Sequence, residues 1–211
     1  MNEVDIKTIS HKKLLNRIYK AEESKFFETA SFGFFVYLMT DLVLFASLFA
    51  VYAVLEANTV GGPSGQQIFN LNNVLLETLA LLISSFTMGL AILSMKKNHR
   101  NKVLGYLVIS FLLGLVFLLI EMTEFNHLIA IGDSWRRSGF LSGFFVLVGT
   151  HGLHIMVGLI WMAIMFYKIL KFGLSRVNIR RLTLLSMFWH FLDIVWIFIF
   201  TIVYLYGALG R

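Results

Sequence analysis

Long apolar stretches and short polar breaks alternate along the chain. Five stretches are rich in Leu, Phe, Ile and Val and have no continuous polar face: residues 31–55, 73–95, 103–129, 140–167 and 182–209. A helix needs about 20 apolar residues to cross the hydrocarbon core of a bilayer, and each stretch is long enough. Strands of a membrane barrel would instead alternate apolar and polar residues. The pattern therefore predicts an all-α, polytopic membrane protein, a bundle of five transmembrane helices over residues 31–209.

Residues 1–30 precede the first apolar stretch and carry charges of both signs. Their pattern is only weakly amphipathic, so we expect a surface helix or a partly disordered segment, separate from the bundle. The break after the first stretch contains Gly61, Gly62 and Pro63. These residues favour a turn, which separates the first two predicted helices.

Lys and Arg are distributed unevenly between the polar segments. The N-terminal segment and the second and fourth loops hold 15 of them, whereas the first and third loops and the C-terminus hold 3. Cytoplasmic segments of membrane proteins carry an excess of Lys and Arg. We therefore expect the N-terminus in the cytoplasm and the C-terminus in the periplasm. Contact with anionic lipid headgroups also accounts for the net charge of +6, so no nucleic-acid partner is expected.

Composition narrows the possible chemistry. Only 14% of the residues are charged and 58% are hydrophobic, whereas about 25% of the residues of a soluble domain are charged. A soluble globule of 211 residues has too little interior for so many apolar side chains. The chain contains no cysteine, which excludes disulfides, thiol catalysis and metal sites ligated by cysteine.

Ionisable side chains interrupt the apolar stretches at a few positions. Each such group costs at least about 2.5–3.5 kcal/mol to insert, so these groups usually pair or mark a pathway. Position along the helices, at a fixed rise per residue, places one set near the midplane and another toward the outer side. The midplane set is Asp41, His151, His154, His190 and Asp193, and the outer set is Glu77, Glu121, Glu124 and His127.

Spacing assigns these groups to helix faces. His151 and His154 share one face of their helix, and His190 and Asp193 share one face of the next, because three residues separate the members of each pair. A carboxylate at the midplane requires a hydrogen-bond donor. We therefore expect the imidazole of His151 or His154 to pair with Asp41.

Four kinds of site fit these ionisable residues. In the first, they hydrogen-bond between helices and stabilise the bundle. In the second, His151 or His154 and His190 ligate the iron of a haem b, as in a membrane anchor of a quinol dehydrogenase. In the third, Glu124 and His127 supply half of a di-iron motif whose second half is missing from the sequence. In the fourth, carboxylates such as that of Asp41 line a proton path.

Small residues mark the helix predicted at residues 140–167. Gly139 and Gly143 form a Gly-x-x-x-Gly motif, and Gly149 and Gly152 follow. Small residues at this spacing allow close approach of another helix. We therefore expect this helix to pack against protein rather than lipid along the glycine face.

Two polar motifs near the C-terminus are distinctive. One is Thr-His-Gly-Leu-His-Ile at residues 150–155, and the other is Phe-Trp-His-Phe-Leu-Asp-Ile-Val-Trp at residues 188–196. They resemble the signatures of subunit III of the haem–copper respiratory oxidases. The acid Asp41, the Gly-Gly-Pro turn and the acidic stretch from Glu121 to Glu124 follow the same order as in that family. Five helices rather than seven, together with Asp41 and Glu77, resemble the bo-type ubiquinol oxidases above all, with an aa-type menaquinol oxidase as the alternative.

The resemblance implies a chain without catalytic residues or a redox centre. Such a chain packs on oxidase subunit I, in a complex with subunits II and IV in the bacterial inner membrane, and binds phospholipid between its helices. Haem and copper then lie in the partner subunit, and no metal binds here. The complex oxidises quinol, reduces dioxygen to water and pumps protons, while subunit III supports proton uptake and stability. The ionisable residues then serve as interhelical bonds and subunit contacts; the alternative is the haem b anchor.

Overall fold

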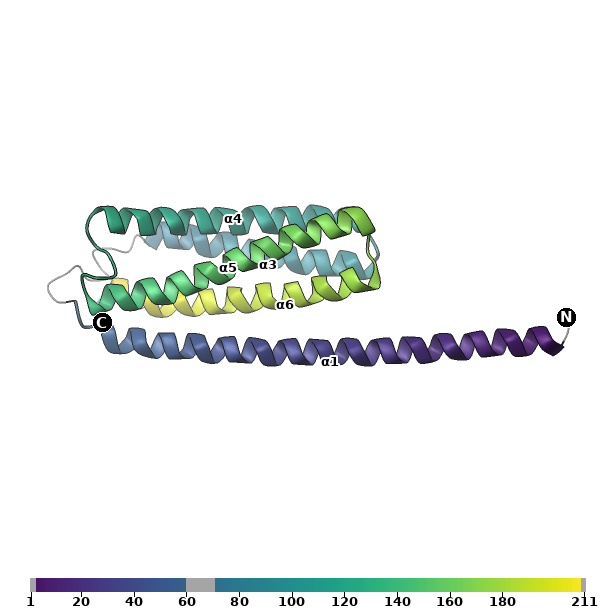
Figure 1. Cartoon of the computed structure of the whole chain (residues 1–211). Helices are drawn as coiled ribbons and strands as arrows, with labels where there is room; N and C mark the ends of the chain where they lie inside the picture. Colours follow the sequence, from purple (N-terminus) through teal and green to yellow (C-terminus); the bar gives the residue numbers. More distant parts are fainter. Residues whose placement is uncertain (1–2, 60–70, 210–211) are drawn as a thin grey trace. The chain divides into compact units, whose positions relative to one another are not determined.

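A computed structural model describes residues 3–59 and 71–209, without the side chains of residues 3–24, 26 and 209. The helices are α1 (Glu3–Leu55), α3 (Leu71–Lys96), α4 (Arg100–Ala130), α5 (Gly139–Phe172), α6 (Arg176–Ile199), the π-helix η1 (Phe200–Leu205) and α7 (Tyr206–Leu209) (Figure 1). These residues contain no strand, and five of the helical segments are long and apolar enough to cross a membrane. The predicted all-α fold, with five helices long and apolar enough to cross a membrane, is therefore confirmed in the described residues.

Helices α5 and α6 extend beyond the predicted apolar stretches, and a serine side chain caps the start of each. The hydroxyl of Ser138 accepts a hydrogen bond from the backbone N–H of Leu141 at the start of α5, and Ser175 does the same for Asn178 in α6. Gly173 ends α5 with a φ of 66°, which glycine adopts without strain. Residues 139–172 are therefore helical, five residues past the predicted end of the fourth stretch.

The chain forms two compact units, and the boundary falls within α1, between Thr40 and Asp41. The first unit contains the N-terminal part of α1, where the rings of Phe34 and Tyr37 lie 5.7 Å apart. The helix runs from Glu3 without a break, so secondary structure does not change at residue 30. The predicted Gly61–Pro63 turn lies outside the described residues.

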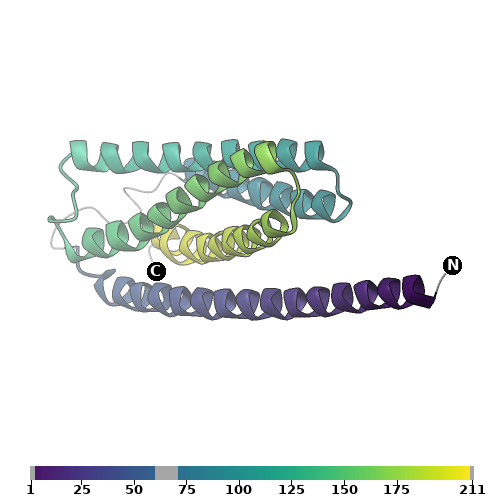
Figure 2. The same ribbon diagram turned by 45° about the vertical axis from the view of Figure 1, so that its right-hand side comes forward.

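The second unit is a helix bundle. α3 packs against α4 and α6, and α5 packs against α4 and α6, so these four helices enclose a common interior (Figures 1 and 2). The C-terminal part of α1, residues 41–55, belongs to this unit and packs on the bundle of these four helices. Tyr52 packs against Phe140 of α5, and Phe49 lies 6.5 Å from Phe198 of α6, measured between ring centroids.

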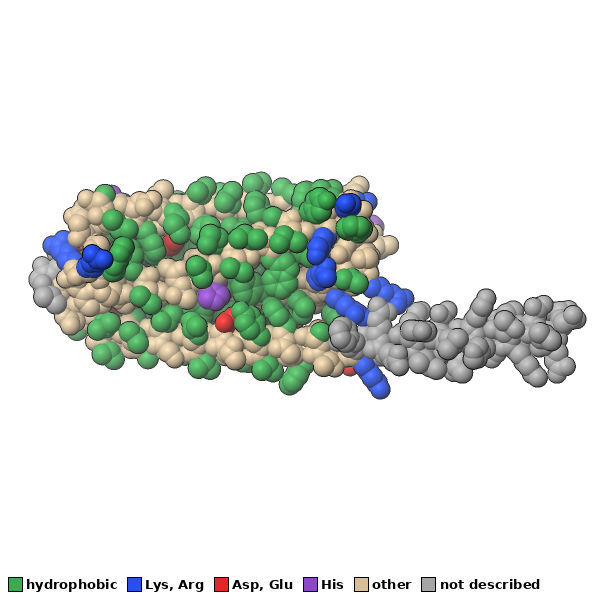
Figure 3. All heavy atoms as spheres, in the orientation of Figure 1, with side chains coloured by type: hydrophobic (Ala, Val, Ile, Leu, Met, Phe, Trp, Pro, Cys, Tyr) green, Lys and Arg blue, Asp and Glu red, His purple; other side chains and the backbone are tan. Residues whose placement is uncertain are grey.

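The outer surface of the bundle is apolar. Phe86, Leu153 and Phe198 are each more than half exposed. Figure 3 shows apolar side chains along the bundle and Lys and Arg side chains gathered near its ends. This distribution suits a protein surrounded by lipid, with charged residues at the headgroups.

The π-helix η1 changes which residues face the interior after α6. Val195, Trp196 and Ile199 are buried, and a regular α-helix would repeat the first two at positions 202 and 203. Val203 and Tyr204 are buried instead, and Ile202 is exposed. The extra residue in the π turn therefore rotates Tyr204 into the bundle.

Candidate functional site: the polar interior of the bundle

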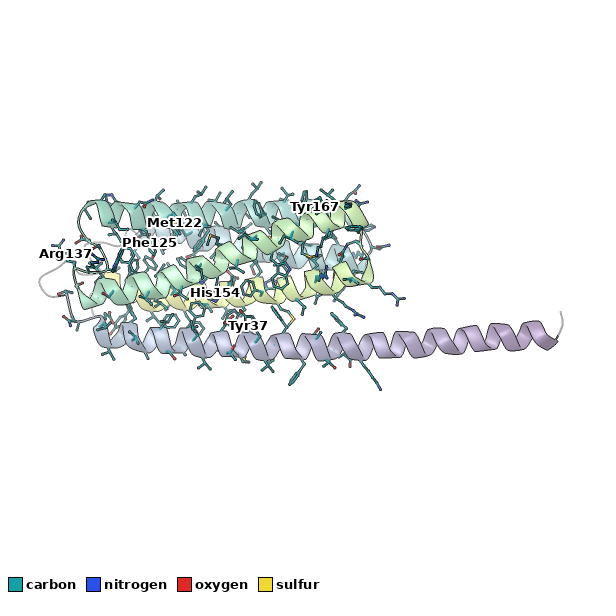
Figure 4. The ribbon with its side chains drawn as sticks, in the orientation of Figure 1. Tyr37, Met122, Phe125, Arg137, His154 and Tyr167 are labelled. Atoms are coloured by element: carbon teal, nitrogen blue, oxygen red, sulfur yellow. The ribbon has the colours of Figure 1, made fainter. Side chains whose placement is uncertain are left out.

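Asp41 and His154 meet where the end of α1 lies on α5. The Nε2 atom of His154 is 4.0 Å from the Oδ2 atom of Asp41. The Nδ1 atom donates a hydrogen bond to the carbonyl of Thr150 at 2.7 Å, since a carbonyl can only accept. His154 lies midway along α5, and the ring of Phe45 covers it (Figure 4). Of the two expected partners, the structure therefore places His154 beside Asp41.

His151 lies in a different environment, although it shares the same helix. Its side chain is fully buried and its ring stacks on Trp196, with 5.4 Å between centroids. The rings of Phe117 and Phe45 approach it edge-on at 5.9 and 6.3 Å. Neither ring nitrogen has a hydrogen-bond partner among the described residues. Aromatic side chains therefore occupy the space around this imidazole.

His190 and Asp193 both interact with Ser85 of α3, a residue that the sequence analysis did not identify. The Nδ1 atom of His190 is 2.6 Å from the hydroxyl of Ser85. Ser85 also interacts with the carboxylate of Asp193. The expected pair on one face of α6 is therefore linked to α3 through a serine.

A layer of hydroxyl groups joins α3, α4 and α6. The indole N–H of Trp189 donates to the hydroxyl of Ser84 at 3.0 Å, and that hydroxyl donates to the carbonyl of Ser110 at 2.9 Å. The hydroxyls of Thr87 and Ser110 are 2.7 Å apart. Hydroxyl side chains within apolar stretches are a sequence signal for such interhelical bonds.

Two glycines on opposite sides make room for the Trp189 indole. A Cβ atom added to Gly114 of α4 or to Gly158 of α5 would lie 2.8 Å from the indole ring. The ring therefore fits only because both positions lack side chains. Gly158 follows Gly149 and Gly152 in the sequence of α5, whereas α4 contains only Gly105 and Gly114.

The glycines singled out in α5 face two different helices. Gly139 and Gly143 face α1, and a Cβ atom at Gly143 would lie 3.4 Å from the Cα atom of Tyr52. Gly149 and Gly152 face α4, where the nearest side chains are those of Phe125 and Leu118. The Gly-x-x-x-Gly pair therefore lies where the end of α1 approaches α5.

Three glutamates form an acidic cluster between α3 and α4. Glu77 and Glu121 are at most 1% exposed, and Glu124 is half-buried. Their carboxylates are close enough for their charges to interact. His127 is exposed, so the structure does not bring it into the cluster with Glu124. Within residues 3–59 and 71–209, no three His, Asp or Glu side chains are arranged to hold a metal ion.

Comparison with known proteins identifies the family. The family model described as cytochrome c oxidase subunit III matches residues 18–208. The cytochrome bo(3) ubiquinol oxidase subunit 3 of Pseudomonas putida is 58% identical over 84% of this chain and 86% of its own length. The protein with that name from Buchnera aphidicola subsp. Baizongia pistaciae is 45% identical over 92% of this chain and 99% of its own. Quinol oxidase subunit 3 of Bacillus subtilis is 42% identical over 84% of this chain and 87% of its own length. The chain therefore belongs to the cytochrome c oxidase subunit III family of the haem–copper respiratory oxidases, in its bo-type branch.

Proposed function

We propose that this chain is the non-catalytic subunit III of a proton-pumping ubiquinol oxidase in the aerobic respiratory chain. The complex oxidises ubiquinol and reduces dioxygen to water, and this subunit supports proton uptake and stability. One observation carries the proposal: the chain matches two relatives named bo(3) ubiquinol oxidase subunit 3 along 86% and 99% of their own lengths. Polar side chains that bond helix to helix suit a supporting role in the membrane.

The partners of the chain are oxidase subunits I, II and IV, with subunit I as the main contact. The complex lies in the bacterial inner membrane, with the N-terminus of this chain in the cytoplasm. The excess of Lys and Arg on one set of polar segments supports this orientation. In this proposal Asp41, His154, His190 and Asp193 hold helices in place for contact with the other subunits.

Phospholipid binding is supported by an apolar cavity of about 220 Å³ between α4 and α5. Its lining residues are Leu107, Val108, Phe111, Met162, Ala163 and Phe166. Near the same end of the bundle, the Arg100 guanidinium bonds to the carbonyl of Leu170. A lipid tail in the cavity would thus place its phosphate near cationic side chains.

Haem and copper belong to the partner subunit in this proposal, and the haem b anchor is the competing function. The packing around His151 supports the placement of haem in the partner subunit. Three aromatic rings surround the His151 ring, so a porphyrin would have to displace them.

Purification of the complex through a tag on this chain tests both functions. We expect a larger haem–copper subunit and quinol oxidase activity to accompany the tagged chain. We also expect His151→Phe and His190→Asn to leave the haem content of each complex unchanged. Absence of a haem–copper subunit from the preparation would refute the subunit III function. Loss of one haem from each complex in either variant would establish the anchor.

A further inference from the structure

The acidic cluster lies beside two tyrosines. The Tyr204 hydroxyl is close enough to interact electrostatically with the carboxylates of Glu77, Glu121 and Glu124, and also with Tyr52. The rings of both tyrosines lie along α5, since Tyr204 packs against Phe144 and Tyr52 against the adjacent Gly143. Side chains of α1, α3, α4 and η1 therefore converge at one place inside the second unit.

Ring contacts independently locate the cluster. The indole of Trp196 donates a hydrogen bond to Thr78, the residue after Glu77, at 3.1 Å. The same indole lies 4.6 Å from the ring of Phe117, one helical turn before Glu121. Trp196 also lies 5.9 Å from the Tyr204 ring. This indole thus links the helices that carry both buried glutamates to Tyr204.

The buried oxygen atoms of the cluster have no hydrogen-bond partner in the described part of the chain. They are both carboxylate oxygens of Glu77, both of Glu121 and the Oε2 atom of Glu124. The Tyr52 hydroxyl, on a side chain with no exposed area, has no partner either. Buried polar atoms almost always have a partner, either a protein group or an ordered water molecule. The carboxylates therefore need donors, and the tyrosine needs an acceptor.

Charge restricts what can satisfy these atoms. Three ionised carboxylates close together in a low-dielectric interior repel one another, and such groups become neutral by taking up protons. A protonated carboxyl can donate one hydrogen bond, which leaves its other oxygen in need of a donor. Water provides both donors and acceptors, and a buried water molecule typically makes about three hydrogen bonds to polar groups.

We propose that Glu77, Glu121 and Glu124, together with Tyr52 and Tyr204, form a hydrated proton-holding site inside the bundle. Internal water molecules bridge the carboxyl groups to the tyrosine hydroxyls. The carboxyl groups share at least one proton. The site therefore binds water molecules and at least one proton, and that proton can exchange with solvent.

Glu56 connects this site to the end of the bundle. The backbone N–H of Glu56, the first residue after α1, donates to the Tyr52 carbonyl at 2.8 Å, so the two residues lie one turn apart. Glu56 lies beyond the membrane-spanning part of α1 and interacts electrostatically with Tyr52. Partial burial raises the pKa of the Glu56 carboxyl above its ordinary value. In this proposal, Glu56 and Tyr52 connect the site to the aqueous phase at this end of the bundle.

Infrared spectroscopy of the purified whole oxidase tests for the shared proton. We expect the wild-type complex to show a C=O stretching band of a protonated carboxyl that shifts in D₂O. The band should be lost in Glu121→Gln or Glu77→Gln and retained in Glu28→Gln, which replaces an exposed glutamate of the first unit. A spectrum that is the same in wild type and in both cluster variants would overturn the proposal.

A density map of the wild-type complex at a resolution that shows water provides a test without any substitution. We expect at least one water peak within hydrogen-bond distance of both a cluster carboxyl and a tyrosine hydroxyl. The Tyr52→Phe variant, which keeps every carboxyl, should lose a water peak and shift the infrared band. A cluster without water in the wild type, or one that holds a metal cation, would overturn the proposal.

Discussion

At the residue scale, buried polar side chains differ in how closely a partner approaches them. Ser84, Ser110 and Trp189 satisfy one another directly across helices. Asp41 and His154 are 4.0 Å apart, which is longer than a hydrogen bond but within reach of an ion pair. Because Nδ1 of His154 already donates to Thr150, only Nε2 can share a proton with the carboxylate.

Asp41→Asn and His154→Gln should therefore have non-additive effects. We expect a coupling free energy of about 1 kcal/mol, because either substitution alone already removes the charge pair. The measurement is the free energy of unfolding of the four proteins of the double-mutant cycle in detergent. As a control, Asp41→Asn combined with substitution of the exposed His127 by Gln should be additive. Additive effects of Asp41→Asn and His154→Gln would show that the pair does not interact.

The sequence predicted that Asp41 needs an imidazole but left two candidates open. His151 and His154 are three residues apart, and that spacing places both on one broad face of α5. The choice depends on the neighbours of that face. Phe117 and Trp196, from α4 and α6, enclose His151, whereas His154 lies beside Asp41 of α1. These contacts between distant segments cannot be read from spacing within one helix.

At the scale of elements, packing around Trp189 joins the helices of the bundle. Helices in lipid gain little from the hydrophobic effect when they associate, so close packing and interhelical hydrogen bonds stabilise them. The indole lies between Gly114 of α4 and Gly158 of α5 and bonds to Ser84 of α3. One side chain of α6 thereby contacts three other helices.

Gly158→Ala and Gly114→Ala should each destabilise the bundle. The added methyl group would lie 2.8 Å from the indole, so the ring must move and weaken its bond to Ser84. Overpacking of this kind costs about 1–3 kcal/mol. The measurement is the free energy of unfolding, with tryptophan fluorescence as a second signal.

Gly105→Ala is the matched control, because a Cβ atom at Gly105 of α4 would meet nothing within 4 Å. Alanine favours a helix over glycine by up to about 1 kcal/mol, so this variant should be unchanged or slightly more stable. Equal effects at Gly105 and Gly158 would contradict the role assigned to the indole contact.

The helices were largely predictable, whereas η1 was not. Apolar stretches between charged turns identify membrane helices because the bilayer requires a minimum length. Within such a stretch nearly every residue is apolar, so an extra residue in one turn leaves no trace in the hydrophobic pattern. The sequence pattern therefore predicts a regular α-helix over Phe200–Leu205, and the inward position of Tyr204 could not be predicted.

At the scale of the whole molecule, charge at the helix ends determines orientation in the membrane. Lys and Arg are concentrated in the N-terminal segment and on the helix ends that adjoin the turns after α3 and α5. The positive-inside rule depends on these residues and little on Asp or Glu. The turn between α3 and α4 should therefore lie in the cytoplasm, and the turn between α4 and α5 in the periplasm.

Single cysteines test this orientation with little background, because the chain has none of its own. His99→Cys lies in the turn before α4, and Ser134→Cys lies in the turn before α5. In intact cells, a membrane-impermeant maleimide should label Ser134→Cys once it has crossed the outer membrane, and should label His99→Cys only after the inner membrane is permeabilised. Labelling in the reverse order would show the opposite orientation.

The π turn also allows the C-terminal helix to shorten by one residue without changing which of the later residues face the interior. A helix that contains one surplus residue can lose one and become a regular α-helix. Deletion of the exposed Thr201 would therefore be absorbed locally, and the residues now at 203 and 204 would still face inward. Straightening of the turn at constant length would instead carry Tyr204 away from the glutamates. Single-residue deletions in homologous chains should thus be tolerated here more readily than at the tightly packed middle of α6.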